Sequence, residues 1–357
     1  CHVHTFNRNA VPDRFLPGWL NPLANFLENK GTAVFLFRLF NTLRKHELAL
    51  LVKKYHAFLN VGGLKSQLEI FKHLQGFYPV GTLFCVLPMD MDFMQAGVAK
   101  QPYLEQLDEL AQIKKDPAYR NLIHPFVFVH PERKGIFDIV KKYVEEKGFA
   151  GLKLYPPLGY YPFDKRLDEI YSYAEKYQLP ITTHCARGGV FYKGKITADM
   201  LIHPKTGEQL KQQKNKFFTD AYTNPDNYRY VLERFPRLKI NLAHFGGYDE
   251  WQKYLEGNTF EDNLNTWYEK IIGLTRRYPN VYSDISYTMF NADLFALLKL
   301  TLQDDLLKKR ILFGSDFYMV EQQTNERQFV TNVQGFIGEE NFRRIADLNP
   351  RSFLQRI

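Results

Sequence analysis

Short apolar runs alternate with amphipathic stretches along most of this chain. The apolar runs are rich in β-branched and aromatic residues, and they predict strands over Thr82–Leu87, Ile123–Val129, Gly151–Leu154, Ile181–His184, Ile240–His244, Val281–Ser286 and Ile311–Gly314. Apolar positions at helical spacing predict helices over Pro102–Lys115, Ile136–Lys147, Arg166–Tyr177, Pro225–Phe235, Asn263–Tyr278 and Phe295–Lys309. Strands that alternate with helices indicate a parallel sheet. With His2–His4 as the end of a further strand, which would begin upstream of Cys1, the pattern predicts an α/β fold, a (β/α)8 TIM barrel.

Two segments are longer than the connections between strands in a simple barrel. Residues from about Asn7 to Tyr78 form a helical insertion after strand 1, and Gly188 to Thr223 form a long loop after strand 5, where loops usually have ~2–6 residues. The long loop carries Phe191, Tyr192, Phe217, Phe218 and Tyr222 among lysines. It belongs to the face on which barrels keep their active sites, so it predicts a lid or a substrate wall, with a plain surface excursion as the alternative. We therefore expect residues 1–357 to form a single domain with two insertions.

Composition narrows the class of protein. No apolar run approaches the roughly 20 residues that span a bilayer, so we expect no membrane partner. The formal charge of +8 is spread along the chain without stacking aromatics, which argues against nucleic acid and fits an anionic small-molecule substrate. Cys1, Cys85 and Cys185 are too few and too widely spaced for a disulfide framework, which favours the cytoplasm. The first insertion is expected to cover the barrel or to form a homodimer contact.

Residues with metal-binding chemistry follow the predicted strands. Each ends or closely follows an apolar run: His2, His4, Lys153, His184, His244 and Asp316. Because the carboxyl ends of barrel strands converge, we expect these side chains to meet at one point. Imidazole and carboxylate groups bind divalent transition metals, so the set predicts a site for one or two ions, zinc first and manganese as the alternative.

Alternation within a strand predicts which neighbours share the barrel interior. His2 and His4 are two residues apart and should face one ion together, while His184 should point inward with Thr182, and His244 with Leu242. The alternative for the last two histidines is a core residue hydrogen-bonded to the backbone. Asp316 follows a Gly-Ser turn, and it either caps a helix or binds the metal and takes a proton from its water.

Lys153 raises a separate question. Parity places it inside the barrel with Gly151 and Tyr155, where an ammonium without an anionic partner is costly. Carbamylation by carbon dioxide would turn the side chain into a carboxylate that can bridge two metals. The alternative is a lysine that pairs with Asp316 or binds a substrate anion.

Several phrases resemble those of one enzyme family. The histidine pair, the histidines after strands five and six and the aspartate after strand eight are similar to those of the amidohydrolase superfamily. FPRLKINLAHFGG, YPNVYSDISY, RILFGSDF and NPRSFL resemble its amidohydrolase-related branch, which includes aminocarboxymuconate semialdehyde decarboxylase and its relatives. GLKLYP resembles the strand-four segment of dihydroorotase, whose lysine is carbamylated and bridges two zinc ions. The aspartate expected just before the histidine pair is absent, because Cys1 stands there.

The resemblance implies roles for individual residues. His2, His4, His184 and Asp316 would bind a first metal, and Lys153 would bridge to a second. His244 would bind the second metal or act as an unligated catalytic residue.

Together these roles favour a hydrolase in which a metal-activated water attacks an amide, lactone or ester of a small, carboxylated substrate. Asp316 and His244 would be catalytic. Substrate binding is expected from Arg187, Tyr155 and Tyr160. A mononuclear decarboxylase or hydro-lyase on the same scaffold is the alternative, and a barrel that binds a metabolite without catalysis is the third hypothesis.

Overall fold

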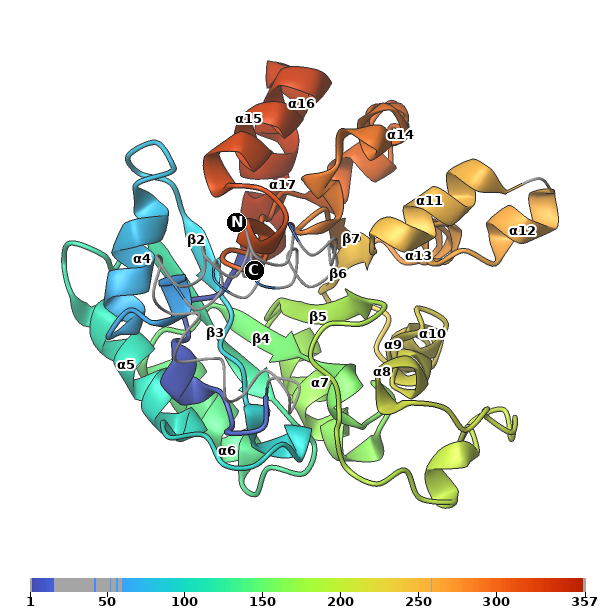
Figure 1. Ribbon diagram of the computed structural model, residues 1–357, viewed down its shortest axis with the longest axis horizontal. Helices are drawn as coiled ribbons and strands as arrows, with labels where there is room; N and C mark the ends of the chain where they lie inside the picture. Colours follow the sequence, from blue (N-terminus) through green and yellow to red (C-terminus); the bar gives the residue numbers. More distant parts are fainter. Residues whose placement is uncertain are drawn as a thin grey trace.

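The computed structural model describes residues 2–15, 60–257 and 259–355, together with positions 42, 52 and 56. Eight parallel strands form one sheet in chain order (Figure 1). The strands are β1 His2–Val3, β2 Phe84–Val86, β3 Ile123–Val129, β4 Gly151–Leu154, β5 Ile181–Ala186, β6 Ile240–Gly246, β7 Val281–Asp284 and β8 Ile311–Leu312. The predicted TIM barrel is confirmed, and the bounds of β3 and β4 match the prediction to the residue.

The first and last strands meet at a seam. Val3 forms a parallel bridge with Phe317, which lies beyond the end of β8. The His4 amide donates to the Phe317 carbonyl at 2.6 Å, and the Asp316 amide donates to the His2 carbonyl at 3.0 Å. These contacts place the segment after β8 directly beside β1, so the curled sheet joins its own edge.

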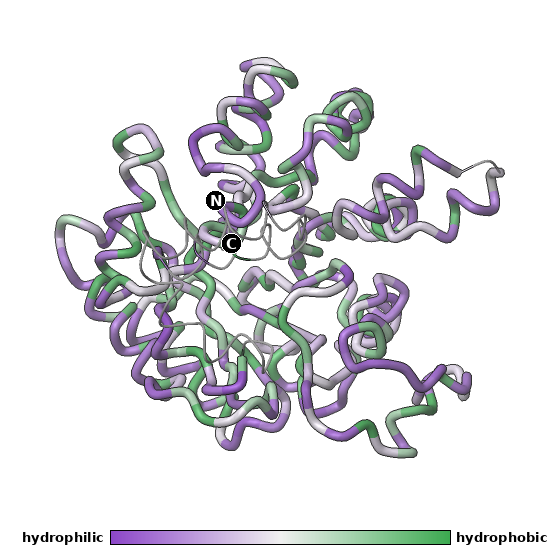
Figure 2. Tube along the Cα trace, viewed as in Figure 1, coloured by the Kyte–Doolittle hydropathy of each residue, from purple (hydrophilic) through white to green (hydrophobic). Residues whose placement is uncertain are grey.

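Helices surround this sheet (Figure 1). They are α4 Gln67–Gln75, α5 Tyr103–Lys115, α6 Ile136–Lys141, α7 Asp168–Lys176, α8 Asn215–Phe218, α9 Asp220–Thr223, α10 Asn227–Leu232, α11 Tyr248–Glu256, α12 Phe260–Leu264, α13 Trp267–Arg277, α14 Phe295–Thr301, α15 Glu326–Ile337, α16 Glu339–Arg343 and α17 Asn349–Leu354. Hydrophilic and hydrophobic positions alternate along them, as an apolar face toward the sheet requires (Figure 2). Within the described residues, every helix is too short or too polar to cross a bilayer.

Two predicted helices are divided in the structure. The stretch predicted as one helix over Phe295–Lys309 contains α14 and, after a turn, a separate 3-10 helix, Leu307–Lys309. The stretch 263–278 was expected to be continuous, but it contains the end of α12 and all of α13. Thr266 has extended backbone, and its side chain accepts the Glu269 amide, so it caps the start of α13. A hydroxyl that caps the backbone locally overrides the helical periodicity around it.

Most of the first predicted insertion lies outside the described residues. Its described parts are residues 7–15, positions 42, 52 and 56, and residues 60–78, which include α4. The second insertion, 188–223, is described throughout and contains the short helices α8 and α9.

The start of β4 is tightly packed. Gly151 pairs with Phe126 across the β3–β4 ladder. A Cβ atom added at Gly151 would lie 2.6 Å from Phe126 Cε2 and 2.6 Å from the Pro180 carbonyl oxygen. Glycine is therefore required here by close approach, since backbone and a buried ring cannot both retreat.

We expect Gly151→Ala to lower the free energy of unfolding by about 1–3 kcal/mol, because the added methyl overpacks the strand. The matched control is Gly273→Ala on an exposed turn of α13, where a Cβ meets nothing within 4 Å. That change should stabilise by up to about 1 kcal/mol through helix propensity. Equilibrium denaturation with urea measures both values. Equal stability of the two variants would contradict the packing argument.

Candidate metal centre

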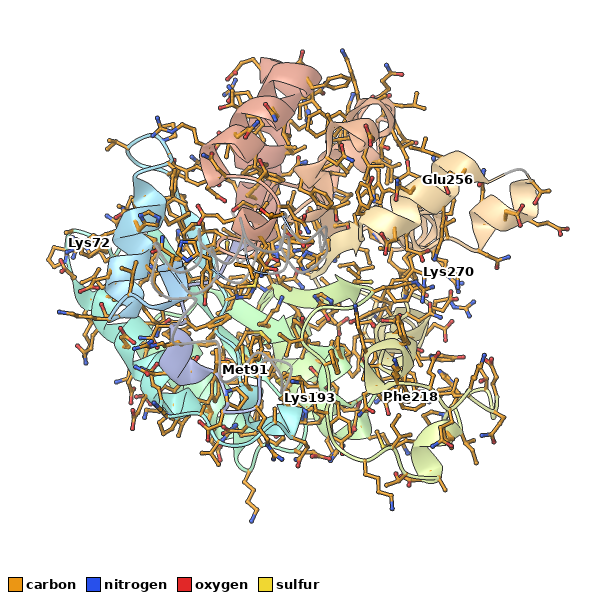
Figure 3. All side chains as sticks on the ribbon, in the orientation of Figure 1. Lys72, Met91, Lys193, Phe218, Glu256 and Lys270 are labelled. Carbon is orange, nitrogen blue, oxygen red and sulfur yellow. The ribbon has the colours of Figure 1, made fainter. Side chains whose placement is uncertain are left out.

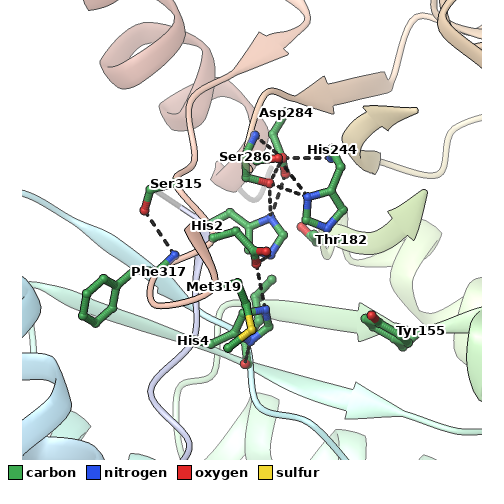
Figure 4. A network of polar contacts seen from close by, with 12 residues as sticks. His2, His4, Tyr155, Thr182, His244, Asp284, Ser286, Ser315, Phe317 and Met319 are labelled. Carbon is green, nitrogen blue, oxygen red and sulfur yellow. Dashed lines mark hydrogen bonds and ion pairs between the residues drawn. The ribbon is translucent and has the colours of Figure 1, made fainter. Parts of the chain in front are cut away.

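Three side chains from the seam meet at the carboxyl end of the barrel. His2, His4 and Asp316 are all buried, and each offers a ligand atom that lies within 4.8 Å of the other two. Asp316 Oδ1 is 3.5 Å from His2 Nε2 and 3.1 Å from His4 Nε2. Figure 4 shows His2 and His4 together with the neighbouring His244, Asp284 and Ser286. The strand contacts that close the barrel therefore also bring these three groups together.

The outer nitrogen of each histidine is fixed by an acceptor. His2 Nδ1 lies 3.0 Å from Asp284 Oδ2, and His4 Nδ1 lies 2.7 Å from the Leu87 carbonyl oxygen. A carbonyl or an ionised carboxylate can only accept, so each Nδ1 carries a proton and donates it. Burial lowers the pKa of His2 to about 4, so its ring is neutral and its Nε2 holds a lone pair. Such outer contacts are how proteins orient metal-binding imidazoles.

The inner atoms fit a cation. In the described part of the chain, His2 Nε2 and Asp316 Oδ1 are buried atoms without a hydrogen-bond partner. Burial favours the neutral acid, but the contact with His4 and the neighbouring His244 and His2 rings hold the pKa of Asp316 below its ordinary range. A lone pair and an ionised oxygen that face each other without a shared proton are stabilised by a positive ion between them. The donor set of imidazole and carboxylate suits a divalent transition metal.

Asp284 organises the surroundings of the centre, and sequence analysis missed it as a site residue. Its Oδ2 accepts from His2 Nδ1 and from Asn241 Nδ2 at 2.6 Å. Its Oδ1 accepts from the His244 and Ser286 amides, each at 3.1 Å, and from the Ser286 hydroxyl. Burial opposes ionisation, but His2, His244 and Ser286 hold the pKa of Asp284 well below its ordinary range. The signal that could have found it is the one used for Asp316, an acidic residue at the end of a predicted barrel strand.

The strand parity predicted for His244 was wrong. Asn241, not Leu242, faces the barrel interior, because Asn241 pairs with Thr182 and Tyr282 and its amide reaches Asp284. His244 has a φ of 69°, which breaks the alternation and turns its side chain inward. Its Nδ1 lies 2.9 Å from the Ser286 carbonyl oxygen and therefore donates, so a neutral ring leaves Nε2 as an acceptor.

His184 and Lys153 lie beside the three-residue cluster rather than in it. The His184 ring stacks on Tyr155 with centroids 4.5 Å apart, and it lies 4.7 Å from the His244 ring. Its Nε2 is 3.1 Å from the Ala186 carbonyl oxygen. Lys153 is completely buried, and its Nζ has no hydrogen-bond partner among the described residues. Burial lowers the pKa of Lys153 to about 8, opposed by the charges of Asp316 and Asp284.

The centre opens into a cleft of about 860 Å³. His4, His184, His244 and Asp316 line it together with residues of the long loop after β5: Val190, Phe191, Lys193 and Lys216. The long loop therefore forms part of the wall of the cleft, while its contact with substrate and its closure as a lid stay predictions. Phe218 and Tyr222 of the same loop are buried instead.

The three expected substrate contacts differ in position. Tyr155 lines the cleft, and its hydroxyl accepts the Val190 amide at 3.1 Å. Arg187 also lines the cleft, but its guanidinium contacts Glu250 and Asp220. Tyr160 is buried and is not among the described residues of the lining, and its contact with substrate stays a prediction. Its hydroxyl lies 2.8 Å from the Tyr155 amide and 3.3 Å from the Val129 carbonyl, where it supports the backbone of Tyr155.

Comparison with known families identifies the chain. Residues 84–356, well over half of the sequence, match the sequence model described as amidohydrolase. The chain belongs to the amidohydrolase family. Members of this family are enzymes that use divalent metals, in agreement with the donor set above. None of the curated protein sequences matches the chain.

Solved structures share the amidohydrolase fold at low sequence identity. An uncharacterised TIM-barrel protein from Bordetella bronchiseptica superimposes with a TM-score of 0.53 at 16% identity, over 80% of this chain and 82% of its own. The 5-carboxyvanillate decarboxylase of Sphingomonas paucimobilis gives a TM-score of 0.53 at 15% identity, over 87% and 90%. An amidohydrolase from Burkholderia multivorans gives 0.51 at 11% identity, over 80% and 86%. At these identities the likeness concerns the fold.

We expect Asp284→Asn to weaken zinc binding by about 10- to 100-fold, because the amide cannot hold the His2 Nδ1 proton as a carboxylate does. A competition titration against a chromophoric chelator measures the affinity, and circular dichroism of the metal-free protein checks folding. Asp305→Asn, at a side chain that is 89% exposed, is the control and should leave the affinity unchanged. Equal affinities of the two variants would show that Asp284 does not orient the ligands.

Proposed function

We propose that this amidohydrolase is a metal-dependent hydrolase, in which a metal-activated water attacks an amide, lactone or ester of a small, carboxylated substrate. The observation that carries the proposal is the buried Asp316 Oδ1, which has no hydrogen bond in the described part of the chain, beside two imidazole Nε2 atoms. Asp316 also lines the cleft. Such a group suits hydrolysis at neutral pH, because an ionised carboxylate next to the ligand atoms can accept a proton from the attacking water.

The residues would divide the work as follows. A divalent metal held by His2, His4 and Asp316 would supply Lewis acidity and lower the pKa of the attacking water. The Asp316 carboxylate takes one proton from that water and passes it to the leaving atom of the substrate. With a single metal bound, His244, whose Nδ1 proton is donated to the Ser286 carbonyl, would present Nε2 as an acceptor that orients the water. Tyr155 and the loop after β5 shield the reaction from bulk water.

Lys153 supports a second metal in this proposal. Its neutral amine attacks the carbon of carbon dioxide, an N–C bond forms, and one proton leaves to solvent, giving a carboxylated side chain. The support is the completely buried Nζ, which makes no hydrogen bond within the described residues. His184 and His244 border the same space and would complete the second set of ligands. Imidazole and carboxylate donors make zinc the first choice and manganese the second.

A mononuclear decarboxylase or hydro-lyase is the second candidate. One observation favours it: the three-residue cluster is assembled without Lys153, while His184 Nε2 is occupied by the Ala186 carbonyl. In that reaction His244 and Asp316 would handle protons at carbon, and Lys153 would remain an amine.

A product assay separates the two candidates. The zinc-loaded protein is incubated with carboxylated aromatic lactones, amides and esters, and with the corresponding aromatic acids. Hydrolysis of lactones and esters releases acid, which a pH-stat records, and hydrolysis of amides releases an amine, which liquid chromatography records. Decarboxylation releases carbon dioxide, which mass spectrometry records. Asp316→Asn is the control and should lower either rate by at least about a hundredfold, since it removes the proton acceptor. Release of carbon dioxide without hydrolysis would replace the first proposal by the second.

Metal content tests the role of Lys153. We expect about two zinc ions per chain for the wild-type protein in bicarbonate buffer, and about one for Lys153→Met, which cannot form a carbamate. Inductively coupled plasma mass spectrometry counts the ions, and carbon-13 NMR after labelling with ¹³C-bicarbonate detects the carboxylated lysine. Wild-type protein reconstituted without carbon dioxide is the control that changes no residue, and it should resemble the variant. One zinc ion in every sample would leave Lys153 unmodified.

A further inference from the structure

The cleft contains three cationic side chains other than histidine among its described residues: Arg187, Lys193 and Lys216. A carboxylated substrate needs one of them free. The contacts of each cation therefore decide which can bind the substrate anion.

Arg187 is already neutralised. Its Nε lies 2.6 Å from Glu250 Oε1, and its Nη1 lies 3.4 Å from Asp220 Oδ2. The Trp267 ring covers the guanidinium with its centroid 4.4 Å away. Lys253 Nζ also lies 2.7 Å from Glu250 Oε1, so two cations and two carboxylates balance, and this group has no net positive charge to offer a substrate. Arg187 joins the end of β5 to α9 and α11 instead.

Lys193 is occupied by backbone. Its Nζ donates to the carbonyl oxygens of Arg14 and Phe15, each at 2.7 Å. Its own amide donates to the Met94 carbonyl at 2.7 Å. Figure 3 shows Lys193 and Phe218, which belong to the two arms of the long loop. Lys193 therefore attaches its part of the long loop to the backbone of Arg14 and Phe15.

The backbone of Lys216 is held in place, and its ammonium group has no polar partner among the described residues. It is exposed on α8, and among the described residues its ammonium has no ion pair or hydrogen bond, only the Phe217 ring 5.8 Å away. Next to it, Asn215 Nδ2 donates to the carbonyls of Tyr192 and Gly194 at 3.0 and 2.7 Å, and Phe218 is buried. These contacts hold the backbone of Lys216 in place. Its Cε would lie 3.9 Å from a Cβ at Gly188, so the side chain runs over the loop that follows His184.

We propose that Lys216 binds the carboxylate of the substrate and thereby selects carboxylated substrates, an inference that rests on the proposed function of the centre. Asp249 is exposed and also lines the cleft, and its negative charge favours binding of the substrate carboxylate at the Lys216 end of the cleft. It repels a carboxylate from the α11 side. Aromatic side chains of the lining, among them Phe191, Tyr248 and Phe290, suit a ring between the carboxylate and the reacting bond.

Binding of paired probes tests this role without requiring turnover. Isothermal titration calorimetry on the full chain compares the three benzene dicarboxylates with the carbamoylbenzoates that replace one carboxylate by an amide. We expect the wild-type protein to prefer at least one dicarboxylate over its amide by roughly three- to tenfold, as a solvent-accessible charge contact gives. Lys216→Gln should abolish this preference, and Lys216→Arg should keep most of it. Lys214→Gln is the matched control, because Lys214 is exposed on the same segment and does not line the cleft.

The outcomes separate this inference from the proposed function. A preference that survives in Lys216→Gln, or a wild-type protein that shows no preference for any dicarboxylate, would overturn the role of Lys216. Loss of the preference in Lys216→Gln alone would support it, even if the product assay finds no hydrolysis. Hydrolysis of carboxylated lactones with an unchanged KM in Lys216→Gln would keep the proposed function and reject Lys216.

Discussion

The candidate centre depends on the contact between His2 and Asp284. A buried carboxylate is costly unless its lone pairs are satisfied, and Asp284 receives donors from two side chains and two amides as well as the Ser286 hydroxyl. The same contact fixes the proton of His2 on Nδ1 and leaves Nε2 to face Asp316. One anion therefore sets the tautomer of a ligand, the position of His244 and the end of β7. Removing His2 would leave the buried Asp284 carboxylate short of a donor, which costs at least about 1–3 kcal/mol.

Much of this arrangement could be predicted from sequence, because apolar runs and strand ends are local signals. The bounds of β3 and β4 and the convergence of His2, His4 and Asp316 follow from such signals alone. The orientation of His244 could not be predicted, since a backbone with positive φ is decided by the contacts of the folded chain. Asp284 was missed for a related reason. Its place at the end of a predicted strand was a signal, but its partners come from β1 and β6, and their contacts with it exist only in the folded chain.

The role of Arg187 in the cleft could not be predicted from sequence either. In sequence, Arg187 after the β5 histidine was a natural anion-binding residue. In the structure, its guanidinium forms ion pairs with Glu250 of α11 and Asp220 of α9, so it supports the fold. Whether an arginine binds substrate or a carboxylate of its own chain depends on which acidic side chains the fold places beside it. A sequence pattern does not show those neighbours. The contribution of the first insertion, including a homodimer contact, stays a prediction because most of it lies outside the described residues.

The seam between β1 and the segment after β8 has a consequence for folding. His2 and Asp316 belong to opposite ends of the chain, and their backbones are joined by the hydrogen bond at 3.0 Å. Contacts of such long sequence separation form late, because the long chain segment between the two residues must lose conformational entropy before the contact can form. The centre therefore cannot assemble on a nascent chain until the last strand has left the ribosome. An ion that binds there would act as a clasp on the closed barrel, adding its binding free energy to the stability of the native state alone.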